Sequence, residues 1–190
     1  MPHTVEQLRR GVIDFCSLLD QAAVAFAWEG LILPHLMEEK MKQDKAVIGP
    51  GIAMEVIGNA TVESSLISIR ALDEFFDPGD GRPNDIRSHH YSGYRSPGRF
   101  LQNPEFHTIG RRIAHLTLDR VDDSTKPWQI TELITRAYKP SENFLSFVVE
   151  GEGKQYLPKA PFDTASRLFT SRQMDEFMQR VLHQQQERFV

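Results

Sequence analysis

The chain has 190 residues, of which 40% are hydrophobic and 25% charged, which is ordinary globular usage rather than that of a disordered chain. This length suits one domain with a core of its own, so we expect a single domain over residues 1–190. The formal net charge of −4 excludes a global basic field for holding nucleic acid, and the one cysteine, Cys16, excludes an intramolecular disulfide and a cysteine-rich zinc site. Any contact with RNA must therefore come from a local basic patch.

The first predicted helix begins at Thr4, because Thr4 and Gln7 have the spacing of a capping box. Apolar residues then recur at three- and four-residue steps as far as Phe26, and Pro34 should kink or end the helix. The beginning of the chain lacks the basic start and apolar run of a signal peptide, and no apolar segment approaches the roughly 20 residues of a membrane span. We therefore expect a soluble, cytoplasmic protein with no membrane contact.

A second helix is predicted from about Met54 to Phe76, after a break at the sequence GPG (49–51), in which the proline is suited to a helix start. Residues 77–100 are rich in Gly, Pro, Ser, His and Arg and lack periodicity, which predicts a long loop with room for a short helical turn near Asp85 to His90. A loop of this length is usually functional or mobile. Its run HYSGYR (90–95) has two interpretations: a loop that binds single-stranded nucleic acid or, favoured here, a plain loop that covers the bundle.

The run Asn103-Pro104-Glu105 combines an N-cap residue, a first-turn proline and an acid, which predicts a helix from Pro104 to about Arg120. Pro127 opens another helix, and the Lys139-Pro140 pair should interrupt it.

The pattern of residues 142–150 fits a helix or a strand, and its helical setting favours a helix. Residues 151–165 should form a loop, and 171–188 a C-terminal helix. The sum is five or six helices with no convincing strand, so the expected fold is an all-α, up-and-down helical bundle.

Polar side chains follow one ridge of the helix predicted for 104–120. His107, Arg111 and His115 stand at successive four-residue steps, away from an apolar stripe that contains Phe106 and Ile109. Metal-independent RNA cleavage needs a base, an acid and a cation for the phosphorane; histidine serves as base or acid, and arginine grips phosphate bidentately. Two copies across a two-fold axis would complete such a cleft. An ordinary solvated helix face has the same spacing and is the alternative.

The segments LISIRALDEFF (66–76) and IGRRIAHLTLDR (109–120), followed by Trp128, resemble the HEPN superfamily, in particular its small abortive-infection-type bacterial members. The resemblance covers roughly residues 55 to 150. It implies an all-α bundle that usually dimerises, and many members of the superfamily are ribonucleases of toxin–antitoxin or phage-defence systems.

Carried over to this chain, the resemblance implies that His115 is the catalytic histidine. The family's arginine normally precedes it with four to six residues between, but those positions hold Gly110, Ile109 and Thr108 here. Arg111, with three residues between, takes the place of that arginine and keeps to the histidine's face. The remaining candidates, for substrate binding, are Arg112, His107, Arg70 and Asp73.

Together, the residues and the resemblance predict an HEPN-like RNA-binding protein that acts as a metal-independent endoribonuclease. The expected assembly is a homodimer. The expected partners are RNA and an antitoxin or other regulatory protein. No cofactor or metal is assigned, because the adjacent His89 and His90 are a poor tetrahedral set with His107 and His115. The alternative is a catalytically degenerate helical module for protein interaction or regulation. A third hypothesis, a small-molecule sensor with a pocket between helices, has no residue in the sequence to indicate it.

Overall fold

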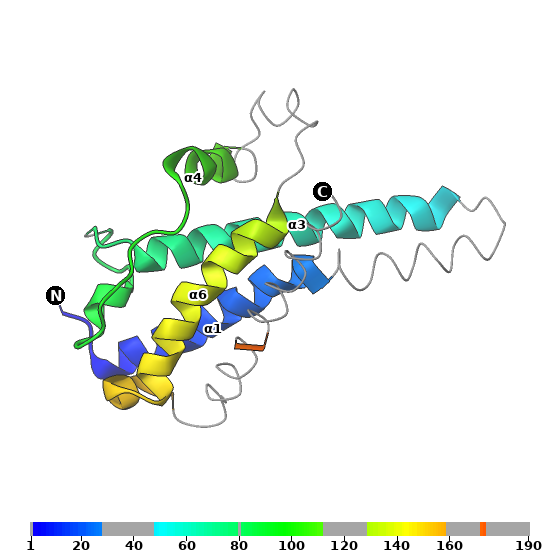
Figure 1. Ribbon diagram of the computed structural model, residues 1–190. Helices are drawn as coiled ribbons and strands as arrows, with labels where there is room; N and C mark the ends of the chain where they lie inside the picture. Colours follow the sequence, from blue (N-terminus) through cyan, green and yellow to red (C-terminus); the bar gives the residue numbers. More distant parts are fainter. Residues whose placement is uncertain (1, 28–47, 80, 112–128, 159–171, 174–190) are drawn as a thin grey trace, which may run out of the picture.

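The computed structural model describes residues 2–27, 48–79, 81–111, 129–158 and 172–173, and all regular structure in this part of the chain is helical. Three long helices, α1, α3 and α6, lie side by side, and the short α4 lies against α3 (Figure 1). This confirms the all-α class. The described part has four α-helices with defined bounds, and the count of five or six for the whole chain stays a prediction. In chain order the elements are α1 Val5–Ala27, α3 Ile48–Phe76, the 3₁₀ helix η2 Ser88–His90, α4 Asn103–Ile109, α6 Ile130–Val149 and the 3₁₀ helix η4 Glu152–Tyr156.

The start of α1 is the one predicted from the sequence. The backbone N–H of Thr4 donates to Gln7 Oε1 at 2.8 Å, and the N–H of Gln7 donates to Thr4 Oγ1 at 3.2 Å. This reciprocal pair satisfies two amides that the first turn leaves without helical partners. Pro34, where the helix was expected to kink or end, lies outside the described residues.

The start of α3 corrects a prediction. The helix begins at Ile48, so the GPG sequence at 49–51 is part of its first turn and does not break the chain before Met54. A proline is tolerated there because a first-turn residue has no helical acceptor for its N–H. Farther along, α3 packs on α1, and the hydroxyl groups of Ser65 and Ser68 donate to the backbone and side-chain oxygens of Gln21 at 2.9 and 3.0 Å.

The course of α6 corrects a second prediction and confirms a third. The helix runs without interruption through Pro140, and 142–149 is helical, as its setting suggested. A helix-interior proline costs about 3 kcal/mol, because one backbone hydrogen bond is lost and the ring crowds the preceding turn. Buried residues on both sides, Ala137 and Phe144 among them, keep the helix continuous by packing into the core. Pro127 lies outside the described residues.

An aromatic cluster joins the three long helices. The rings of Phe15 from α1, Phe75 from α3 and Phe144 from α6 lie with each pair of centroids 4.8 Å apart. All three side chains are buried. Such tilted and edge-on ring contacts contribute about 0.5–1.5 kcal/mol a pair beyond the burial of apolar area, so this cluster fixes how the helices cross.

The predicted loop at 77–100 covers the bundle, which confirms the plainer of its two interpretations. Tyr91 is fully buried and donates its hydroxyl to Leu8 O at 2.9 Å, while Tyr94 packs on the rings of Phe144 and Phe147. The helical turn expected near Asp85 to His90 is the 3₁₀ helix η2, Ser88–His90.

Two predictions about the C-terminal part of the chain are only partly confirmed. The stretch expected as loop at 151–165 contains the 3₁₀ helix η4, whose Tyr156 is buried with its ring 5.1 Å from that of Tyr91. Of the helix expected at 171–188, the structure describes only 172–173, which are helical.

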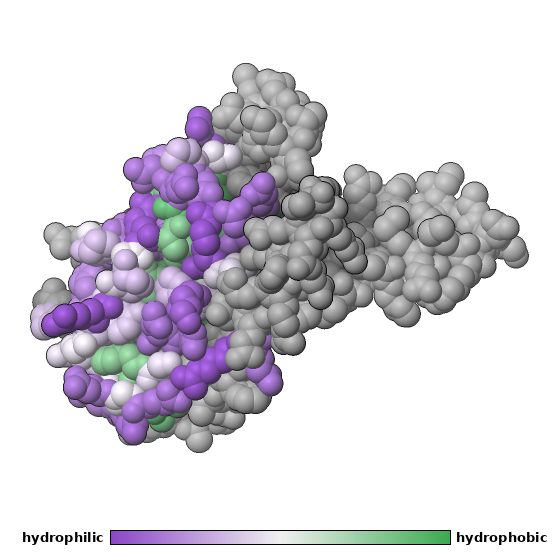
Figure 2. Space-filling view, in the orientation of Figure 1, coloured by the Kyte–Doolittle hydropathy of each residue, from purple (hydrophilic) through white to green (hydrophobic). Residues whose placement is uncertain are grey.

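The surface of the described residues is largely polar. The face in Figure 2 is mostly hydrophilic, with small separate apolar patches. Within the described part of the chain, none of the helices combines the length and apolar character needed to cross a membrane.

Candidate functional site

The predicted site residues that the structure describes lie on or against α4. This helix begins one residue before the predicted start: Gln102, not Asn103, is the N-cap, and its N–H donates to Glu105 Oε2 at 2.8 Å. Pro104 occupies the first turn, as expected. The α-helix ends at Ile109 and continues as a π-type turn at 110–111, whereas a longer helix to about Arg120 was predicted; 112–120 lies outside the described residues.

The ring of Phe106 on α4 lies between two guanidinium groups. Arg70 of α3 has its Cζ 4.3 Å from the ring centroid, and Arg99 of the preceding loop has its Cζ 4.1 Å from it. Guanidinium groups stack on aromatic faces with a gain of about 0.5–2 kcal/mol, depending on desolvation. A Cβ at Gly110 would overlap the Arg70 guanidinium, so glycine at this position makes room for the arginine. We call Arg70, Phe106 and Arg99 the arginine–phenylalanine stack.

Asp73, a predicted substrate-binding residue, holds Arg99 of this stack in place. Its side chain is 0% exposed. One carboxylate oxygen accepts from Arg99 Nε at 2.8 Å, and the other accepts from the backbone N–H groups of Phe100 and Leu101, both at 2.8 Å. A buried carboxylate with these bonds positions the loop and Arg99. The role of Asp73 in binding a substrate stays a prediction.

A second ion pair fastens α4 to α6. The two carboxylate oxygens of Glu105 accept from Arg136 Nη1 and Nη2 at 3.1 and 2.6 Å. The hydrogen bond from Arg136 is the largest of the causes that hold the pKa of Glu105 below its ordinary value. Because this pair is bidentate, it fixes the orientation of α4 as well as its position.

The outer side of α4 carries the described half of the predicted ridge. His107 and Arg111 are both exposed, while Ile109 is buried, as the apolar stripe predicted. Arg111 lies in the π-type turn, so the rotation of 100° per residue that put it in line with His107 does not hold there. The other ridge residue, His115, and its neighbour Arg112 lie outside the described residues.

Arg70 is the one further predicted binding residue in the described part. Its guanidinium is partly exposed, and its Nε donates to Glu74 at 3.2 Å. Arg70 thus contacts α4 directly, through Phe106, whereas Asp73 binds the loop residues that precede α4.

Sequence reasoning missed Arg99, Phe106 and Arg136 as parts of this site. Arg99 lies in a loop without periodicity, and Arg136 lies 31 residues after its partner Glu105. No local spacing signals such pairs, because only the packing of α3, α4 and α6 brings them together.

Three histidine side chains lie close together at η2, away from α4. The ring of His90 lies 4.6 Å from that of His3 and 4.2 Å from that of His89. Burial, and then the neighbouring His89, His3 and Arg87, lower the pKa of His90. Among the described residues, no three His, Cys, Asp or Glu side chains converge in a way that would hold a metal ion.

Comparisons of the chain with protein-family models, with curated proteins and with solved structures found no match.

Proposed function

We propose that this chain is an HEPN-like RNA-binding protein that cleaves RNA without a metal ion, with Arg111 and His115 as the reacting pair. In this proposal His115 exchanges the proton, and Arg111 holds the phosphate through its bidentate guanidinium. Toxin–antitoxin or phage-defence systems are the setting that the resemblance implies, with an antitoxin or other regulatory protein as partner.

The observation that carries the proposal is the grouping of arginines around α4. The chain is acidic overall, yet Arg70, Arg99 and Arg111 lie on or against this one short helix, beside the exposed His107. A local cationic face is what a protein of net charge −4 needs in order to meet a phosphate backbone.

A second candidate function, the catalytically degenerate interaction module, is favoured by a different observation. The guanidinium of Arg99 is bound to Asp73 at 2.8 Å, and that of Arg70 to Glu74 at 3.2 Å. Arginines that are paired in this way serve to hold α4 in place, and a ridge on α4 then serves as a contact surface for a protein partner.

The two functions are separated by an assay of purified protein on a single-stranded RNA of mixed sequence, with DNA of the same sequence alongside. We expect cleavage of RNA alone, which persists in EDTA. His115→Ala should abolish cleavage, and so should Arg111→Lys, because a point charge does not reproduce a bidentate grip.

The matched controls are His89→Ala and Arg95→Lys, which change the same residue types at exposed positions of the 77–100 loop. Both should cleave as the wild type does. Cleavage that survives His115→Ala would contradict the mechanism. Absence of cleavage by the wild type, with or without RNA binding, would contradict the nuclease and favour the degenerate module.

A further inference from the structure

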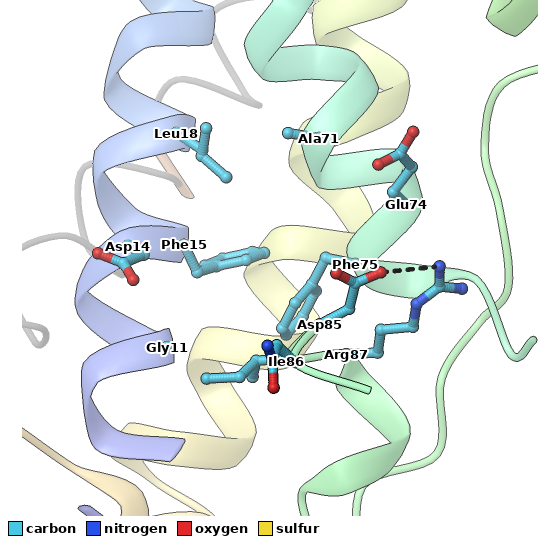
Figure 3. A pocket seen from close by; sticks show the side chains of 11 residues that line it. Gly11, Asp14, Phe15, Leu18, Ala71, Glu74, Phe75, Asp85, Ile86 and Arg87 are labelled. Carbon is cyan, nitrogen blue, oxygen red and sulfur yellow. Dashed lines mark ion pairs between the residues drawn. The ribbon is translucent and has the colours of Figure 1, made fainter. Parts of the chain in front are cut away.

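A groove opens between α1 and α3, with a cavity volume of about 300 Å³, at the lower end of the range for small-ligand pockets. Its floor is made by Phe15 and Phe75, whose ring centroids lie 4.8 Å apart, and Leu18 and Ala71 flank them (Figure 3). One end is closed by Ile86, in the loop that crosses from α3. The groove therefore has an apolar, aromatic floor between two rigid helices.

The rim of the groove is acidic. Three carboxylates, those of Asp14, Glu74 and Asp85, and one guanidinium, that of Arg87, are among the residues that line it. Arg87 is already paired with two carboxylates, because its nitrogens lie 3.3 Å from Asp77 and 3.7 Å from Asp85 (the latter dashed in Figure 3). The groove thus has more negative than positive charge.

Asp14 is the carboxylate that this charge balance leaves for a ligand. It is exposed on α1, on the side of the groove opposite Glu74 (Figure 3), and Glu74 is engaged with Arg70 at 3.2 Å. Burial raises the pKa of Tyr91, and the negative charge of Asp14 raises it further.

We propose that this groove binds a small organic cation, an amine or guanidine carried on a short apolar body. The apolar floor takes the apolar body, and the carboxylate of Asp14 at the rim pairs with the charge. A neutral ligand of the same shape makes only the apolar contact with the floor, and the carboxylates of the rim repel an anion. This site is independent of the RNA function proposed for α4.

The test uses the full chain, labelled with ¹⁵N, and phenethylamine as the probe, with 2-phenylethanol as its neutral analogue and phenylacetate as its anionic one. We expect saturable shifts of the backbone amide signals around Asp14 and Ala71 with phenethylamine, weaker shifts with the alcohol, and none with phenylacetate. N-acetyl-arginine amide, added in a separate titration, tests whether an arginine side chain of a peptide fits instead. Tighter binding of this probe than of phenethylamine would overturn the assignment to a cation on a short apolar body.

Two variants test the ion pair with Asp14 and the space in the groove separately. Asp14→Asn should weaken binding about two- to fivefold, as the loss of one exposed ion pair predicts. Ala71→Leu should abolish binding by filling the groove, and Glu6→Gln, an exposed acid on the same helix, should leave binding unchanged.

Three outcomes would overturn the proposal: equal response to the amine and the acid, unchanged affinity in Asp14→Asn, or full binding by a folded Ala71→Leu protein. If Ala71→Leu does not fold, the Asp14→Asn result and the comparison of the three phenyl compounds decide the matter.

Discussion

Asp73 shows how one buried charge organises the surroundings of α4. Its side chain is completely enclosed, and its three hydrogen bonds join α3 to Arg99 and to the backbone just before α4. Burying a carboxylate is costly unless all of its partners are present. The cationic stack on Phe106 therefore depends on a fully buried residue.

We predict that Asp73→Asn lowers the free energy of unfolding by about 3 kcal/mol, because it removes the ion pair with Arg99 and sets an amide N–H₂ against donors. Urea denaturation monitored by circular dichroism measures this. The control is Glu74→Gln, on the same helix, which breaks a partly exposed pair with Arg70 and should cost less than about 1 kcal/mol. Equal losses in the two variants would contradict the structural role of Asp73.

At the scale of elements, the turn at η2, in the loop after α3, contains a hydrogen bond that depends on a neutral imidazole. The N–H of Arg87 donates to His90 Nδ1 at 3.0 Å, which requires that nitrogen to be unprotonated. Nearby, His3 Nε2 lies 3.2 Å from Asp85 O, and its ring lies against that of His90. The segment before α1 and the turn at η2 therefore share one small polar cluster.

The lowered pKa of His90 predicts a pH dependence with a definite sign. Between this lowered value and the ordinary value of 6.5, the unfolded chain binds more protons at this site than the folded chain does. The free energy of unfolding should therefore be greatest above about pH 6.5 and fall as the pH drops through that window.

Urea denaturation of wild type and His90→Gln between about pH 5 and 7.5 checks this, because the glutamine oxygen still accepts from Arg87 but does not titrate in this range. The slope of stability against pH should shrink in His90→Gln and persist in His107→Gln, which changes an exposed histidine. An unchanged slope in His90→Gln would refute the assignment.

At the scale of the whole molecule, α1, α3 and α6 form the body, and α4 lies on α3 with its His107 and Arg111 side exposed (Figure 1). One such ridge offers few groups for chemistry, and a second copy across a two-fold axis would double them. We therefore propose that the chain forms a homodimer in which the two α4 helices lie near each other.

Light scattering over a range of concentrations should give the mass of a dimer, and a monomer throughout would contradict the proposal. The arrangement is tested by His107→Cys with a short bismaleimide, since the natural Cys16 is buried. We expect a cross-linked dimer from this variant and none from the control Arg95→Cys, at an exposed loop position.

What the sequence alone determined about this protein is mostly local. The capping box of Thr4 and Gln7, the apolar stripe of α1 and the helical class follow from spacings of three and four residues, and the structure confirms them. Local rules failed at the GPG of α3 and at Pro140, where the structure continues a helix that single-residue preferences would end. At Pro140, packing of the neighbouring residues into the core outweighs propensity, whereas at Pro50 the first turn has no helical acceptor for the missing N–H.

What only the tertiary structure decided depends on residues far apart in the chain. The sequence picked out Arg70 and Asp73 but gave no sign that Arg99 and Phe106 meet them, or that Asp73 is enclosed. It gave no sign of a groove either, because Asp14 and Ala71 lie 57 positions apart and face the same space only once α1 and α3 pack. Periodicity records which face of a helix is apolar, whereas the partner of that face is set by how the helices cross.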